Sequence, residues 1–368
     1  MKKKTIFGNW EASAIIINLI CTKIFLNFPR MAAETGGTAA WLFTIFIAAL
    51  AFLGFTVIQI LYKPFEGKDL LDIAELAAGN PGRVLAGLVI ILGAGWCATA
   101  YMRVFSENMK LISLTTSPLS FVELFFTACL AAGAYLGMEA LSRLHAFSVP
   151  FIASGYLLIM VGVVNYIDLG NLLPILGNGA KEIFISGAPK VSVFFEILFL
   201  FLLPPFLKKH DNMKTTGYWS LGLSAFFLVI SSLVFTSVFP YPSSLERIIP
   251  IFHIARLIKL GRFFQRLESI FLFIWAAAAL LYISVCFYFI LFAFQKTFRL
   301  DYYKPLIVPF AIIIMSISFI PTDFSEVITY EVSLFRKWSW IAAFAMPILL
   351  LVLARLRNKG AVRKGRAA

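Results

Sequence analysis

The chain contains ten long runs of apolar residues, and the length of these runs limits the fold more than any other feature. Each run is 17 to 27 residues long, and a helix needs about 20 apolar residues to cross the hydrocarbon core of a bilayer. Only 14% of the residues are charged, against about 25% in a typical soluble domain. We therefore expect an all-α polytopic membrane protein that forms one integral membrane domain over residues 1–368. The ten transmembrane helices are placed at 10–30, 38–62, 84–106, 119–140, 146–166, 190–207, 217–239, 268–294, 305–321 and 338–356.

A lysine lies deep inside the first of these spans. Lys23 follows Trp10 by thirteen residues, which is about 20 Å along a helix that rises 1.5 Å per residue. The hydrocarbon core is about 30 Å thick, so this depth is past its midplane. A charge there costs at least about 2.5–3.5 kcal/mol. A partner must compensate the charge of Lys23, and in a polytopic protein such a place is a candidate site.

The basic residues predict the orientation of the spans, because cytoplasmic loops are enriched in Lys and Arg. With the N-terminus in the cytoplasm, the inner segments hold 19 Lys and Arg residues and the outer segments hold 12, five of them in segment 240–267. Both termini are then cytoplasmic, and the first span is expected to stay uncleaved because no small-residue cleavage site follows it. The net charge of +13 is then explained by the topology and by attraction to anionic lipids. The lipid bilayer is the expected partner, and nucleic acid is not.

Ten spans divide into two halves of five, about 10–166 and 190–356, and an odd number of spans inverts the second half relative to the first. In many transporters built this way, the first helix of each half is broken near the midplane. Here the first span continues into Pro29 and the sixth into Pro204, so both prolines are candidates for a gating or structural role. We expect a five-plus-five inverted repeat.

The same two spans supply the candidate substrate-binding residues. Lys23 and Glu196 occupy corresponding spans, and each charge would be costly alone at this depth. We expect both to face one central cavity, where they either pair directly or divide an amino acid zwitterion, with Lys23 taking the carboxylate and Glu196 the amine. Thr22 and Asn27 are expected to add hydrogen bonds where the first span unwinds. The alternative is that Lys23 snorkels outward and Glu196 caps a neighbouring helix.

Two loops carry helical patterns. Segment 63–83 begins and ends with helix breakers and has apolar residues at helical spacing between them, which predicts a short amphipathic helix. Segment 240–267 has an apolar face and a basic face that includes Arg256, so it is either an interfacial anchor or an outer lid over a central site. Arg256, together with Glu268 at the start of the next span, is a candidate gating or structural residue. Glu123 at the start of the fourth span is, like Glu268, a weaker candidate, for which a position at the membrane interface is the alternative.

Signatures of catalysis and of cofactor binding are absent from the sequence. The four cysteines and three histidines are scattered, so no metal site or disulfide framework is indicated. No phosphate-binding loop, dinucleotide fingerprint or zinc-protease motif occurs. We expect no cofactor, no metal and no enzymatic activity.

Several short motifs resemble one family along nearly the whole chain. Segment 239–250 (FPYPSSLERIIP), followed by Arg266-Leu-Glu268 and Trp275, resembles the spore germination permeases, the B-type subunits of nutrient germinant receptors. Further similar motifs are Phe28-Pro29-Arg30 with Trp41, Asn171-Leu-Leu-Pro174, and Pro189-Lys190 leading to Glu196.

This resemblance implies the fold of the amino acid–polyamine–organocation transporters, with ten spans in a five-plus-five inverted repeat. It also implies sensing or carrying of a small nutrient, typically an amino acid, in the spore inner membrane, together with an A-type membrane subunit and a C-type lipoprotein. Members often have a glycine-containing break in the first span, where this chain has Cys21-Thr22-Lys23. Either ordinary ligand binding is altered here, or the chain represents a branch with a charged site.

Three functions remain open at this point. The first is a germinant-receptor permease that binds an amino acid-like nutrient. The second is a proton-coupled amino acid transporter of the vegetative cell membrane. The third is a membrane enzyme such as a lipid-linked transferase, which would need several acids or histidines converging at one membrane face, and the sequence does not supply them.

Overall fold

The computed structural model describes residues 7–208, 213–258 and 268–365, and within them the chain is helical apart from turns and one isolated bridge between Phe7 and Leu207. Eight helical segments are long and apolar enough to cross a membrane. They are Phe28–Phe65, Leu70–Ile112, Leu119–Leu136, Met138–Gly162, Glu182–Leu202, Met213–Val238, Glu268–Thr297 and Arg336–Arg357.

These eight segments match eight of the ten spans expected from the sequence, and the other two spans are shorter than expected. The first span is α1 (Asn9–Cys21), which ends early because the chain tightens into the 3₁₀ turn η1 (Thr22–Phe25) and then leaves the helix at Leu26. The ninth is α10 (Ile307–Ser318), part of an apolar helix that begins at Lys304.

The remaining elements complete the bundle. Those between α1 and α7 are α2 (Phe28–Gly36), η2 (Gly37–Ala39), α3 (Ala40–Tyr62), η3 (Lys63–Phe65), α4 (Leu70–Ile112), α5 (Leu119–Leu136), α6 (Met138–Gly162), η4 (Val164–Tyr166), η5 (Leu169–Leu172), η6 (Glu182–Ser186), η7 (Ala188–Leu202) and η8 (Pro204–Phe206). Those from α7 onward are α7 (Met213–Val238), η10 (Ser243–Glu246), α8 (Pro250–Leu257), α9 (Glu268–Thr297), η11 (Lys304–Leu306), α11 (Phe324–Tyr330), η12 (Glu331–Phe335), α12 (Arg336–Trp340), η13 (Ile341–Ala345) and α13 (Met346–Gly365).

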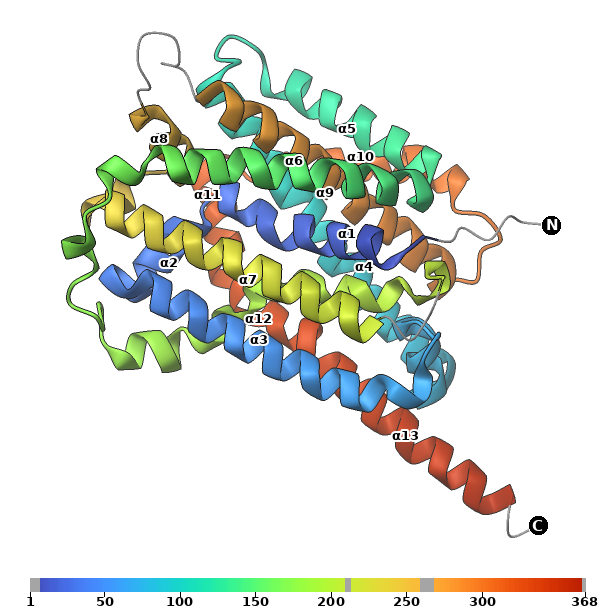
Figure 1. Ribbon diagram of the computed structural model, residues 1–368. Helices are drawn as coiled ribbons and strands as arrows, with labels where there is room; N and C mark the ends of the chain where they lie inside the picture. Colours follow the sequence, from blue (N-terminus) through green and yellow to red (C-terminus); the bar gives the residue numbers. More distant parts are fainter. Residues whose placement is uncertain (1–6, 209–212, 259–267, 366–368) are drawn as a thin grey trace.

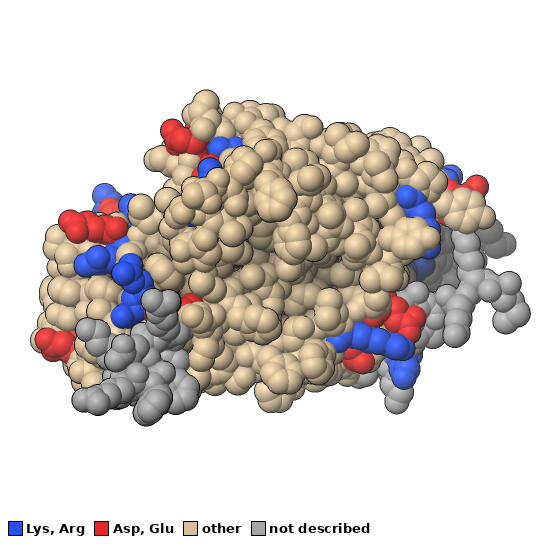
Figure 2. Space-filling model, turned by 90° about the horizontal axis from the view of Figure 1, so that it is seen from above, with Lys and Arg blue, Asp and Glu red and all other residues tan. Residues whose placement is uncertain are grey.

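Helix α1 occupies the middle of the bundle, where it contacts α6, α7, α9 and η7 (Figure 1). Its residues from Ala12 to Ile20 are all buried, which explains why it is apolar on every side. Figure 1 also shows α1 beginning and α13 ending at the same end of the bundle. In Figure 2 the charged side chains gather toward the two ends of the visible face and leave an uncharged band between them, as expected for a protein that spans a bilayer.

Helix α4 joins the amphipathic helix expected in segment 63–83 to the third span. The joint is Gly79, whose φ of 72° is reached easily only by glycine, and Pro81 follows it. Asp69 caps the start of the helix by accepting the amide hydrogens of Leu71 and Asp72, each at 3.0 Å. The expected amphipathic helix is therefore confirmed, although it continues through a kink into the span instead of ending before it.

Candidate functional site

The first and sixth spans are both irregular, and they meet. The first is interrupted between Thr22 and Asn27, and Pro29 lies in the first turn of α2, where its missing amide hydrogen costs nothing. The sixth, η7, is a 3₁₀ helix over its whole length, with non-helical angles at Phe194, and Pro204 follows in η8. Long 3₁₀ stretches are rare and frequently mark functional hinges. Such breaks leave backbone carbonyls without their usual partners, so a buried break needs side-chain donors.

Lys23 and Glu196 supply the first of these contacts. The Lys23 ammonium donates to the carbonyl oxygen of Val193 at 2.6 Å and forms an ion pair with Glu196. The exposed fraction of Lys23 is 2% and that of Glu196 is 0%. Direct pairing, one of the two arrangements expected, is present in this conformation, and Lys23 does not snorkel toward the surface.

A second buried ion pair, which the sequence analysis missed, lies beside the first. The guanidinium of Arg336 donates to Glu331 at 2.8 and 3.1 Å and to the carbonyl oxygen of Ser192 at 3.0 Å. The Ser192 hydroxyl in turn donates to the carbonyl of Arg336 at 2.5 Å. Two buried cations, Lys23 and Arg336, therefore satisfy the carbonyls of two consecutive residues at the break in η7.

Two tyrosines connect the ion pairs. Tyr282 of α9 donates to the free oxygen of the Glu196 carboxylate at 2.9 Å, and Tyr101 of α4 bonds to both Arg336 and Glu331. The centroids of the two tyrosine rings are 4.5 Å apart. These six side chains, all buried, form what we call the central network: Lys23, Tyr101, Glu196, Tyr282, Glu331 and Arg336.

The sequence analysis did not find the second pair. Arg336 was counted with the outer loops, because it adjoins Lys337 and precedes the last apolar run by two residues. The structure corrects this, since Arg336 is only 2% exposed. The available signal was an acid and a base five residues apart immediately before a span, a spacing that the π-helical turn η12 brings together.

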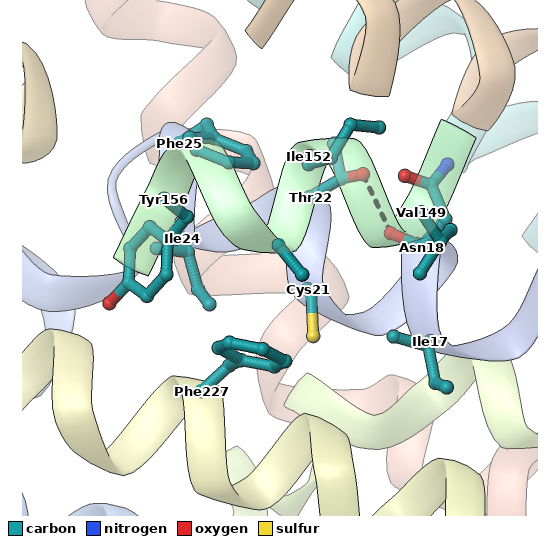
Figure 3. Close-up of a pocket in the computed structure, with 11 residues that line it drawn as sticks. Ile17, Asn18, Cys21, Thr22, Ile24, Phe25, Val149, Ile152, Tyr156 and Phe227 are labelled. Atoms are coloured by element: carbon teal, nitrogen blue, oxygen red, sulfur yellow. Dashed lines mark hydrogen bonds between the residues drawn. The ribbon is translucent and has the colours of Figure 1, made fainter. Parts of the chain in front are cut away.

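The other predicted binding residues lie on different sides of the first span. Asn27 lines a small cavity beside the central network, together with Lys23, Phe28, Met31 and Arg336. Thr22 does not join it, because its hydroxyl donates to the carbonyl of Asn18 at 2.6 Å and it lines a separate cavity between α1, α6 and α7. Figure 3 shows that second cavity, with Cys21 and Phe227 pointing toward each other across it and the Thr22–Asn18 hydrogen bond at its edge.

Neither cavity is large enough for an amino acid in this conformation. The space open to the centre of a water molecule is about 10 Å³ beside the central network and about 30 Å³ in the cavity of Figure 3. One water needs about 10–15 Å³ on this measure. The site is closed, and each buried cation is paired with a buried carboxylate.

The predicted helix in segment 240–267 is partly described. Residues 259–267 lie outside the described residues, whereas α8 packs against η1, α7 and α9 and so covers the break in the first span. Ile251 is fully buried on its inner face. Arg256 lies over the ring of Phe252 at 5.7 Å, and Glu268 is the first described residue of α9. Gating by Arg256, Glu268, Pro29 or Pro204 stays a prediction.

The sequence of residues 9–327 matches the family model described as spore germination protein. The chain belongs to this family. It is 24% identical over 360 residues to spore germination protein A2 of Bacillus subtilis (strain 168), covering 96% of each chain. It is also 24% identical over 358 residues to spore germination protein YndE of the same organism, covering 95% of this chain and 96% of the relative.

Solved transporter structures share the fold. MhsT in complex with L-phenylalanine matches with a TM-score of 0.71 at 16% identity, covering 96% of this chain and 89% of that chain. Mhp1 in a closed conformation matches with a TM-score of 0.66 at 12% identity, covering 98% of this chain and 93% of that chain. The protein is thus an all-α integral membrane protein with a transporter fold, and its relatives and structural neighbours are germination proteins and transporters, not enzymes.

Proposed function

We propose that this chain is the permease-like subunit of a spore nutrient germinant receptor and that its central network binds a small amino acid-like nutrient. The observation that carries this proposal is the buried Lys23–Glu196 pair at the meeting point of two broken spans. Buried ion pairs contribute little to stability compared with well-packed apolar residues, so a role in binding accounts better for their presence. Membership of the spore germination protein family supports the receptor role.

The chemistry of the pair suits a zwitterion. If the two side chains separate, the ammonium of Lys23 is left to meet a carboxylate and the carboxylate of Glu196 to meet an amine. An α-amino acid carries both groups on one carbon atom, so every charge stays paired before and after binding. The likeness to MhsT, which was solved with L-phenylalanine, supports an amino acid as the ligand. Because the site is closed here, binding requires the two spans to move apart.

A nutrient-response assay tests this proposal. The chain and its Lys23→Met variant would be produced in spores lacking other nutrient receptors, and germination measured with each proteinogenic amino acid. We expect Lys23→Met to abolish the response while the variant stays in the membrane at normal amounts. Lys63→Met, which changes an exposed lysine directly after α3, serves as the matched control and should respond normally. An unchanged response in Lys23→Met would remove the pair from the site.

Location and partners belong to the same proposal. The spore inner membrane, an A-type membrane subunit and a C-type lipoprotein fit a germinant receptor, and both termini are placed in the cytoplasm by the bias of basic residues. A cysteine introduced at Asn358 should be protected from membrane-impermeant reagents in intact cells. Uptake of a labelled amino acid by liposomes holding this chain alone would instead favour a proton-coupled amino acid transporter of the cell membrane.

A further inference from the structure

A carboxyl group away from the central network lies buried where α4, α5 and α10 meet. Glu123 of α5 is 0% exposed, although its place near the start of a span predicted an interfacial position. Its oxygen Oε2 lies 2.5 Å from the hydroxyl oxygen of Ser318, the last residue of α10. The other oxygen, Oε1, is buried and has no hydrogen-bond partner among the described residues.

The hydroxyl of Ser318 has two candidate acceptors and one hydrogen. Its oxygen is 2.5 Å from Glu123 Oε2 and 2.6 Å from the carbonyl oxygen of Met315. In a continuing α-helix the amide of Phe319 would serve that carbonyl, but α10 ends here and Phe319 donates to Ser316 and Ile317 instead. The carbonyl of Met315 therefore needs the Ser318 hydrogen. A hydroxyl donates once, so the short contact with Glu123 requires a hydrogen on the carboxyl oxygen.

The surroundings favour the same protonated form. The charged groups that face Glu123 are Arg103 and Glu107 of α4. Arg103 already donates to Glu107 at 3.0 Å and to the carbonyl of Ser318 at 3.0 Å. If Glu123 were ionised, its only donor would be the Ser318 hydroxyl, which the Met315 carbonyl also needs, and Oε1 would have no donor among the described residues. Burying a carboxylate without donors is costly.

The other elements packed against α5 add no compensating charge at this place. Helix α10 carries no charged residue, and the charged residues of the described part of α9 are at its ends, Glu268 and Lys296. The charged residues of α6, Glu139 and Arg143, lie in its first two turns, beside the opposite end of α5.

A mostly apolar cavity lies beside this carboxyl group, which does not line it. The cavity, lined by Arg103, Ser318, Thr99 and Tyr330, offers about 310 Å³ to the centre of a water molecule, which is enough for several waters. Two of its lining residues, Arg103 and Ser318, are the immediate neighbours of Glu123.

We propose that Glu123 is a proton-binding site, occupied in this conformation and separate from the central network. On release, the Glu123 O–H bond breaks, the proton passes to water in the adjacent cavity, and the electron pair stays on the carboxylate. The Ser318 hydroxyl then turns toward Glu123, which leaves the Met315 carbonyl unbonded and loosens the end of α10. The chain continues from that end through α11 to Glu331 of the central network, so proton release and the central site are linked through one short stretch.

Infrared difference spectroscopy of the full-length protein in liposomes tests this proposal without any nutrient. At neutral pH we expect the carbonyl stretch of a protonated carboxylic acid, which shifts in D₂O and disappears reversibly at strongly alkaline pH. Glu123→Gln should remove the band, and Glu139→Gln, which changes an exposed glutamate paired with Arg143, should keep it. A band that survives in Glu123→Gln, or that does not titrate, would overturn the proposal.

A second variant covers the case in which Glu123→Gln does not fold. Ser318→Ala keeps the carboxyl group and removes its acceptor, so the band should persist and move to higher frequency. A band in Ser318→Ala identical to that of the unchanged protein would show that the acid lies elsewhere, and would overturn the assignment independently. Neither outcome depends on the nutrient response.

Discussion

Two groups of ion pairs in this protein differ in the groups to which their cations bond. The central network joins broken spans, and its cations bond directly to main-chain carbonyls at the break. The second group, which we call the rim network, joins the start of α4, on both sides of its kink at Gly79, to the end of α9, and its cations bond to side chains. Its members are Asp69, Asp72, Glu75, Arg83, Lys296 and Arg299.

The two networks also differ in their access to water. The central network is closed from solvent, whereas the rim network borders a hollow that offers about 510 Å³ to the centre of a water molecule. The side chain of Arg299 is 63% exposed and that of Lys296 is 26% exposed. Where water reaches a pair, loss of one partner is compensated by hydration, and where it does not, the partner is left as an unpaired buried charge. Replacing a charged residue should therefore cost much more stability in the central network than in the rim network.

The largest effect is expected at Arg336. Its replacement by Met leaves Glu331 buried and unpaired and removes the donor to the Ser192 carbonyl, so the variant should lose about 3–5 kcal/mol of stability. Thermal unfolding in detergent measures the loss. A loss of stability no larger than that of a variant at an exposed arginine would show that the two networks do not differ in this way.

An intermediate effect is expected where α4 and α9 touch near the rim. A Cβ atom on Gly87 would lie 1.9 Å from the hydroxyl oxygen of Thr297, so Gly87→Ala should cost about 1–3 kcal/mol through overpacking. Gly95→Ala on the same helix is the matched control, because nothing lies within 4 Å of its Cβ position. Unfolding temperatures that fall equally for both variants would show that the close contact between Gly87 and Thr297 carries no such cost.

A smaller, pH-dependent effect is expected for Lys296→Met. Burial raises the pKa of Asp69, and the attraction of Lys296 opposes that rise. Without the lysine the folded-state pKa rises further above its unfolded value, so the penalty, about 1 kcal/mol at neutral pH, should shrink as pH falls through the folded pKa. Unfolding measured between neutral and mildly acidic pH checks the sign, and a penalty that grows with acid would refute it.

The smallest effect is expected for Arg299→Met. Its contact with Glu75 is exposed, so we expect a loss below about 0.5 kcal/mol that vanishes at high salt. Unfolding at low and at high ionic strength provides the measurement. A loss comparable to that of Arg336→Met would show that exposure does not set the weight of these pairs.

The sequence predicted those parts of the molecule that depend on local pattern. The apolar runs, the amphipathic helix in segment 63–83 and the break before Pro29 depend on neighbouring residues, and Lys23 stood out because a charge within a span requires a partner. Arg336 and Glu331 were missed because their burial depends on how α12 packs against η7, a contact between segments about 140 residues apart. Tyr101 and Tyr282 were missed for a similar reason, since an aromatic residue in a span is ordinary until its hydroxyl meets a charge.

The central claim is that Lys23 and Glu196 act as one buried pair, and a double-mutant cycle tests it most directly. Lys23→Met, Glu196→Gln and the double variant would be compared with the unchanged protein by equilibrium unfolding in the same detergent. Because each single variant leaves one charge unpaired and the double variant leaves none, we expect the double variant to be more stable than the sum of the single losses predicts, by about 2 kcal/mol or more. Additive losses, within about 0.5 kcal/mol, would contradict the account.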